Sequence, residues 1–202
     1  MLLSLALSTA LAQTSPGYFR DPALFADTLV FTAEGDLWRV PVTGGVATRL
    51  TTHQGVERRA SFSPDGAWIA FDATYEGPQE VYVMPASGGL PTRLTYEGGT
   101  ARGWTPDGQV VVSSRRDSGL PDARLVTLHP TTFARDVVPL AQADEGAWIG
   151  ADSLIFTRLP FQGSWTKRYT GARRAPIEDG GALAGLRKTL SGYLNSDERG
   201  TP

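Results

Sequence analysis

The chain has 202 residues, 41% of them apolar, and a formal charge of −2, which is typical of a globular protein of one or two domains. No run of like charges occurs, so nucleic acid is not an expected partner. The absence of cysteine from the sequence excludes disulfides, thiolate zinc sites and cysteine nucleophiles.

The first residues have the features of an export signal. Residues 2–12 (LLSLALSTALA) form an apolar run that ends in the small-x-small pattern of a cleavage site. The run is too short for a membrane span, which takes about 20 residues, and no Lys or Arg precedes it. We expect residues 1–12 to be a signal peptide and the mature protein to be periplasmic or secreted, with no membrane span. A buried first helix in a cytoplasmic protein is the alternative.

A unit of 44 residues is then repeated along the chain. Residues 42–51 (VTGGVATRLT) match residues 86–95 (ASGGLPTRLT), which lie 44 positions later. A second phrase, aromatic–hydroxyl–Pro–Asp–Gly followed by a β-branched run, occurs as FSPDGAWIAF at 62–71 and as WTPDGQVVVS at 104–113. Large aromatic residues recur with the unit, and we expect the following ones to lie in the core: Trp68, Trp104 and Trp148.

Each unit is predicted to contain four short strands. In the second unit they are predicted at residues 60–63, 68–73, 80–84 and 92–95, which are rich in β-branched and aromatic residues. Turn residues separate them: Pro64 fixes φ, Asp65 bonds back to the backbone, and Gly66 takes a positive φ. Four strands in roughly 40–45 residues are typical of a β-propeller blade. A β-sandwich is the less favoured alternative, because it gives no reason for a repeat.

The number of units predicts an incomplete ring. Residues 18–170 hold about three and a half units, whereas closed propellers have roughly four to eight blades. The predicted fold is all-β, an incomplete β-propeller of four-stranded blades over residues 17–171. Residues 172–202 form an atypical tail, and residues 172–194 show no strand pattern. We expect a disturbed, truncated reading frame there, with an irregular or helical insertion as the alternative, and we expect the chain to be a fragment of a longer protein.

The repeat resembles the propeller repeats of TolB and of tricorn-type proteases. Residues 17–45 (GYFRDPALFADTLVFTAEGDLWRVPVTGG) resemble the first blade of bacterial tricorn protease homologues, and residues 158–171 (RLPFQGSWTKRYTG) resemble the end of their third blade. Tricorn-type proteases are large serine peptidases whose N-terminal propeller precedes a second propeller, a PDZ domain and a catalytic core. The resemblance therefore implies a non-catalytic N-terminal propeller that guides or filters peptides.

The same resemblance implies the partners. These are peptides or unfolded protein segments, and the downstream protease domains of the same parent chain, which we expect to be a homo-oligomer. A second hypothesis is a TolB-like periplasmic interaction module with no protease attached. A third, less favoured, is a self-contained propeller enzyme.

A search for catalytic groups finds no convincing set. No G-x-S-x-G motif occurs, and we interpret His53 and His129 as solvated loop histidines. Two histidines without cysteine are a poor metal set, and no cofactor is expected. We interpret the two Asp-Gly pairs as turns rather than calcium ligands, and the acidic pair Asp144-Glu145 as part of a solvated loop.

Two arginine pairs are the candidate peptide contacts. Arg58-Arg59 is expected just before the innermost strand of one blade, and Arg115-Arg116 just after the second strand of the next. Guanidinium groups there can bind a carboxylate or peptide carbonyls. Surface or inter-blade ion pairs are the alternative interpretation for all four arginines.

Overall fold

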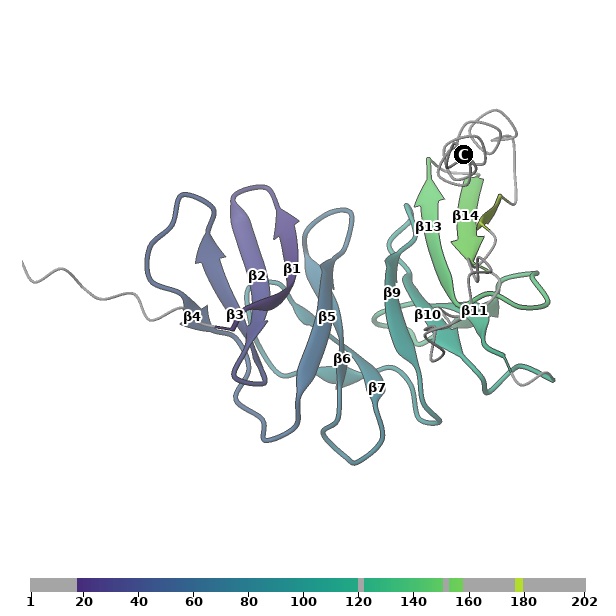
Figure 1. Ribbon diagram of the computed structural model, residues 1–202, viewed down its shortest axis with the longest axis horizontal. Helices are drawn as coiled ribbons and strands as arrows, with labels where there is room; N and C mark the ends of the chain where they lie inside the picture. The colour runs from purple at the N-terminus through teal and green to yellow at the C-terminus, as the bar shows by residue number, and fades with distance from the viewer. Residues whose placement is uncertain (1–17, 120–121, 151–152, 158–176, 180–202) are drawn as a thin grey trace, which may run out of the picture.

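The computed structural model describes residues 18–119, 122–150, 153–157 and 177–179. Within these ranges all regular structure is β, in four antiparallel sheets, three of four strands and one of three. The sheets follow one another in chain order along an open arc (Figure 1). The predicted all-β fold, an incomplete propeller of about three and a half blades, is therefore confirmed.

The blades have a common strand order, each strand pairing with the next along the chain. Blade 1 contains β1 (Arg20–Phe25), β2 (Thr28–Ala33), β3 (Asp36–Pro41) and β4 (Thr48–Arg49), and blade 2 contains β5 (Glu57–Phe62), β6 (Trp68–Ala73), β7 (Glu80–Pro85) and β8 (Thr92–Arg93). Blade 3 contains β9 (Thr100–Trp104), β10 (Val110–Ser114), β11 (Arg124–Leu128) and β12 (Arg135–Val137), and blade 4 contains β13 (Glu145–Ile149), β14 (Ser153–Thr157) and β15 (Ile177–Asp179).

The strand predictions for the second unit agree with blade 2 to within a few residues. The turn between β5 and β6 also has the predicted chemistry. Gly66 has φ 71°, and the Asp65 Oδ1 atom accepts the Ala67 N–H at 3.0 Å and the Ser63 hydroxyl at 2.5 Å. These hydrogen bonds, that from Ser63 first, lower the pKa of the Asp65 carboxyl. The Pro-Asp-Gly phrase is thus a structural turn.

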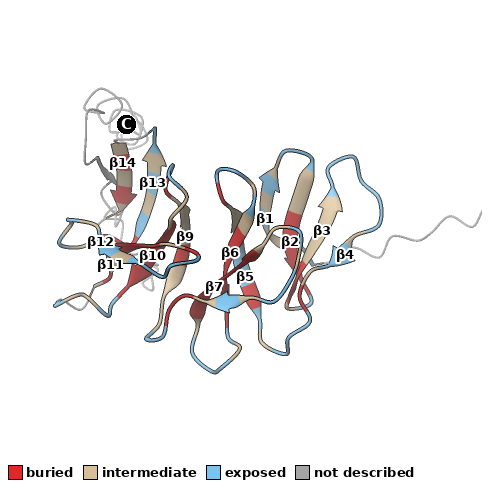
Figure 2. Cartoon of the chain, turned by 180° about the vertical axis from the view of Figure 1, so that it is seen from behind, coloured by how far each residue is buried: buried red, intermediate tan, exposed pale blue. Residues whose placement is uncertain are grey.

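The hydrophobic core lies between the blades rather than within them. In β6, Ile69 and Phe71 pack towards blade 1, whereas Ala70 between them packs towards blade 3. Successive side chains of a strand point to opposite faces, so a strand covered on both sides needs a continuous apolar run. This is why WIAF contains no polar residue, and Figure 2 shows β6 and β7 as largely buried.

The three tryptophans lie at the margins of these cores. Trp68 and Trp104 pack against the cluster between blades 2 and 3, and Trp148 packs against the cluster between blades 3 and 4. All three are half-buried. The prediction of core positions is correct for their contacts, but none of the three is fully enclosed.

The C-terminal part of the chain differs from expectation. Residues 172–194 are predicted to hold no strand, yet β15 pairs with β14 in register, with Ile155 opposite Asp179. The prediction was wrong there because the short strand is extended by pairing with a neighbour, which local composition does not encode. The predicted signal peptide and the rest of the tail lie outside the described residues. Within the described residues, no helix is long and apolar enough to cross a membrane.

Candidate functional site at the axis of the blades

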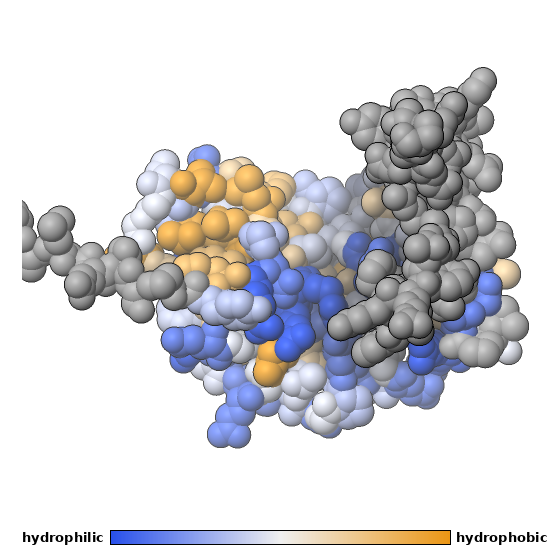
Figure 3. All heavy atoms as spheres, viewed as in Figure 1, coloured by the Kyte–Doolittle hydropathy of each residue, from blue (hydrophilic) through white to orange (hydrophobic). Residues whose placement is uncertain are grey.

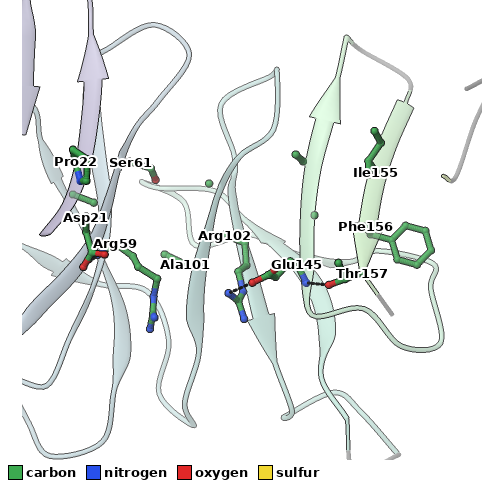
Figure 4. Close-up of a pocket in the computed structure, with 14 residues that line it drawn as sticks. Asp21, Pro22, Arg59, Ser61, Ala101, Arg102, Glu145, Ile155, Phe156 and Thr157 are labelled. Carbon is green, nitrogen blue, oxygen red and sulfur yellow. Dashed lines mark hydrogen bonds and ion pairs between the residues drawn. The ribbon is translucent and has the colours of Figure 1, made fainter. Parts of the chain in front are cut away.

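The first strands of the four blades converge on one hollow of about 530 Å³ (Figure 4). Its walls come from β1, β5, β9 and β13, and β14 adds one side. The first strands of neighbouring blades also contact one another. The blades of a propeller surround a central channel, and the contacting first strands are the ones that face it here, so we call this hollow the axial hollow.

Backbone irregularities shape this hollow at equivalent places in three blades. The pairing of the first and second strands shifts register once in each of β1, β5 and β9. At these shifts φ is positive: 50° at Asp21, 54° at Arg59 and 112° at Gly103. A bulge re-aims a side chain and is frequent next to binding sites, and positive φ is uncommon for residues other than glycine. The bulges thus place the Asp21 and Arg59 side chains at the hollow.

Arg59 is held by a buried carboxylate of its own blade. Its Nε lies 2.6 Å from Asp72 Oδ2, and its Nη2 donates to Gln79 Oε1 at 3.1 Å. The Asp72 side chain is 1% exposed, and its Oδ1 accepts the Ala101 N–H of blade 3 at 2.6 Å. Burial raises the pKa of Asp72, while the Ala101 N–H and Arg59 oppose the rise. One carboxylate therefore neutralises Arg59 and ties blade 2 to blade 3.

A second arginine at the hollow, Arg102 on β9, was not singled out from the sequence. Its Nη2 lies 2.9 Å from Asp144 Oδ1 and its Nη1 lies 3.3 Å from Glu145 Oε1, which links blade 3 to the start of blade 4. Asp144 also accepts the Ser113 hydroxyl at 2.5 Å. The interpretation of Asp144 as a solvated loop residue was wrong, because the carboxylate is buried in this ion pair; Glu145 is exposed.

The four predicted arginines lie in three different settings. Arg58 and Arg59 lie within β5 rather than before it, and only Arg59 lines the axial hollow. Arg115 and Arg116 follow β10, as predicted, and both are exposed. Arg116 pairs with Glu97 at 3.5 Å. Within the described chain, the guanidinium groups of Arg58 and Arg115 have no hydrogen-bond or ion-pair partner, so they are free for a ligand.

The two histidines are used in local turns. The Nδ1 atom of His53 accepts the Gly55 N–H at 3.0 Å in the loop between blades 1 and 2. The Nδ1 atom of His129 accepts the Thr131 N–H at 3.3 Å in the loop before β12. In the part of the chain that the structure describes, no group of three or more His, Asp or Glu side chains is arranged to hold a metal.

A buried acidic site links blades 1 and 2 and was also missed by sequence reasoning. Glu57 is 0% exposed and accepts hydrogen bonds from the Thr51 hydroxyl at 2.5 Å, the Leu37 N–H at 3.0 Å and the Tyr75 hydroxyl at 2.7 Å. Burial raises the pKa of Glu57, although these hydrogen bonds lower it. Burial and the neighbouring carboxylate also raise the pKa of Tyr75. The site connects two blades through a carboxylate that solvent does not reach.

One sequence signal for the second arginine exists. Arg102 lies 44 positions after Arg58, so the repeat places an arginine near the axial strand in two successive blades. The carboxylates at the hollow have no such signal. Asp72, which pairs with Arg59, lies in β6, whereas Asp144, which pairs with Arg102, lies just before β13.

The chain consists of stacked, mostly four-stranded blades around a charged hollow, and it is therefore an open β-propeller module. The sequence pattern of the tricorn protease N-terminal β-propeller domain matches residues 16–180, and the chain belongs to this family. The match extends beyond residue 171 and includes β15.

Known proteins share the sequence or the fold of this chain. Tricorn protease homolog 1 of Streptomyces coelicolor is 30% identical over 188 residues, which cover 89% of this chain and 18% of that protein. The crystal structure of the tricorn protease has a TM-score of 0.62 at 20% identity and covers 70% of this chain and 15% of that one. TolB from Agrobacterium tumefaciens also has a TM-score of 0.62, at 21% identity, with 71% and 55% covered. The chain thus spans about a fifth of the curated relative's length.

Proposed function

We propose that the chain is a non-catalytic, substrate-handling propeller of a tricorn-type serine protease. It binds peptides or unfolded segments in extended form at its axis and presents them to catalytic domains of the same parent protein, which is a homo-oligomer. The observation that supports this most directly is the convergence of four first strands on a hollow of about 530 Å³. Ligand sites in proteins are usually concave and carry a small number of polar groups. A hollow lined by the first strands of several blades can hold an extended peptide.

The free arginines supply candidate peptide contacts outside the axial hollow, because neither of them lines it. Arg58 and Arg115 are exposed and have unused donors, so either can bind a carboxylate or carbonyl oxygens of a peptide. Arg59 and Arg116 would first have to leave Asp72 and Glu97. We therefore rank Arg58 and Arg115 above the other two as contacts.

The test combines binding and turnover by the purified chain. Fluorescence anisotropy with labelled decapeptides is expected to show saturable binding, while mass spectrometry of the same samples shows intact peptide. Arg115→Ala and Arg58→Ala are each expected to weaken binding of a peptide with a free carboxyl end by up to about fivefold, the scale of one exposed ion pair. A matched control is Arg39→Ala on β3, away from the axis. Hydrolysis by the chain, or no binding, would contradict the proposal.

A TolB-like interaction module is the second candidate. It is favoured by the equal TM-scores of TolB and the tricorn protease, 0.62 in both cases. The length of the native polypeptide separates the two. A protein with PDZ and serine peptidase segments supports the protease, and one that stops after its propeller supports the TolB-like module.

We also propose that the protein is exported. Residues 2–12 are the basis, as an apolar run with a small-x-small end. N-terminal sequencing of the extracytoplasmic protein is expected to begin at Gln13. Retention of the apolar run on a protein found in the cytoplasm would contradict export.

A further inference from the structure

The charges around the axial hollow favour a positively charged ligand group. Both arginines that line it are already paired with carboxylates, Arg59 with Asp72 and Arg102 with Asp144. Paired guanidinium groups in these positions add little attraction for a further anion, because the nearby carboxylates repel it. The two arginines alone therefore do not make the hollow an anion site.

The carboxylates outnumber the arginines. Asp21 lines the hollow, and its Oδ2 accepts only the backbone N–H of Arg59, at 3.3 Å; within the described residues it has no ion pair. Glu145 also lines the hollow, and its side chain is 57% exposed. It is the second carboxylate beside the Arg102 guanidinium, whose charge Asp144 already neutralises. With Asp72 behind Arg59, four carboxylates surround two guanidinium groups, a formal charge of −2.

Some of the other lining residues are apolar. Pro22 follows Asp21, Ala101 lies between Asp21 and Glu145, and Ile155 lies beyond Glu145 (Figure 4). In Figure 4 Asp21 and Glu145 lie on opposite sides of the hollow. An alkyl chain can contact such walls while its charged end reaches a carboxylate, as lysine side chains do at apolar surfaces.

We propose that the carboxylates of Asp21 and Glu145 attract an ammonium group of an extended peptide into the axial hollow, where it binds at one or the other of them. The inference rests on the proposed function, since it names the kind of peptide that the same hollow takes. A lysine side chain and a free peptide amino end share this chemistry, and both are cations at neutral pH. We therefore expect the hollow to prefer peptides with a positive charge over peptides with a negative charge. The two arginines considered alone would predict the opposite preference.

Matched peptides test the proposal on the full 202-residue chain. Three are acetylated and amidated decapeptides that differ at one central position, Lys, norleucine or Glu. The fourth has the norleucine sequence with a free amino end. We expect the Lys peptide, the free-amino peptide or both to bind about tenfold more tightly than the Glu peptide, with norleucine between them. The tighter of the two cationic peptides identifies the source of the ammonium.

Isosteric variants then locate the interaction. Asp21→Asn and Glu145→Gln are each expected to reduce the preference for Lys over Glu by about three- to fivefold, the scale of a partly exposed ion pair. Glu34→Gln is the control, because its side chain is 78% exposed in the turn between β2 and β3. Circular dichroism melting curves verify that each variant is folded.

The outcomes separate this inference from the proposed function. Equal binding of all four peptides, tighter binding of the Glu peptide, or unchanged preferences in both axial variants would overturn the inference and leave peptide binding standing. No binding of any peptide would overturn both.

Discussion

Blades 1 and 2 have related sequences and different burial. In β7 of blade 2, Tyr82 is 4% and Met84 0% exposed, and both face blade 1. The residues 44 positions earlier, Trp38 and Val40 in β3 of blade 1, are only half-buried. Figure 3 shows apolar side chains gathered over blade 1, where Leu24 is 62% exposed.

Burial in this fold therefore comes from the neighbouring blade. The positions have the same place in the strand and the same apolar character, but only those of blade 2 have a blade packed against them within the described structure. A blade of a repeat protein gains its stability from the interfaces it shares with its neighbours. Equivalent residues of blades 1 and 2 should therefore contribute unequally to the free energy of unfolding.

The largest difference is expected for the matched pair Met84→Ala and Val40→Ala. Removing a fully buried methionine leaves a cavity between blades 1 and 2, which costs about 2–4 kcal/mol of unfolding free energy. The half-buried Val40 should cost about 1 kcal/mol or less, because solvent already reaches it. Urea denaturation followed by tryptophan fluorescence measures both. Equal losses would mean that the outer face of blade 1 is covered in solution.

A second pair tests the repeated turn. Gly66 and Gly108 both have positive φ, 71° and 83°. A Cβ added to Gly66 would lie 2.0 Å from the Phe25 ring of blade 1, whereas a Cβ added to Gly108 would have no atom within 4 Å. Gly108→Ala should cost about 1 kcal/mol, for the left-handed conformation alone. Gly66→Ala should cost about 2–3 kcal/mol, because the ring must also move. Similar costs in urea denaturation would show that blades 1 and 2 do not touch at this turn.

The smallest effect concerns the pH dependence of the contact between blades 1 and 2. Burial raises the pKa of Glu57, so the folded state binds this proton more tightly than the unfolded state. The stability from this proton is fully present below the ordinary Glu pKa of about 4.3 and is lost as pH rises through the raised value. When pH is raised from 4.5 to 7, the Glu57→Gln variant should therefore lose less free energy of unfolding than the natural protein.

Urea midpoints at the two pH values measure this prediction. The exposed variant Glu34→Gln should keep the pH dependence of the natural protein. If Glu57→Gln loses as much stability as the natural protein, the Glu57 carboxyl does not titrate differently in the folded state.

The repeat made the blades predictable from sequence. Strand positions such as Trp68–Ala73, and the positive φ of Gly66, follow from local composition and turn chemistry. β15 did not follow, because its three residues are extended only through pairing with β14. Local patterns thus predict elements that stabilise themselves and miss those that depend on a partner.

The axial site was only partly predictable. The sequence drew attention to Arg59, but Asp21 is brought to the same hollow by a bulge in another blade, 38 positions earlier. The burial of Asp144 depends on Arg102 and Ser113 in blade 3. Such contacts join different blades, so no short stretch of sequence contains both partners.

Photo-crosslinking with a decapeptide that carries a central benzoylphenylalanine tests directly whether peptides bind at the axis. We expect mass spectrometry to find crosslinks on the axial strands β1, β5, β9 and β13, and an excess of unlabelled peptide to remove them. Crosslinks concentrated on the outer strands β4, β8 and β12, or on the open face of blade 1, would contradict peptide binding at the axis.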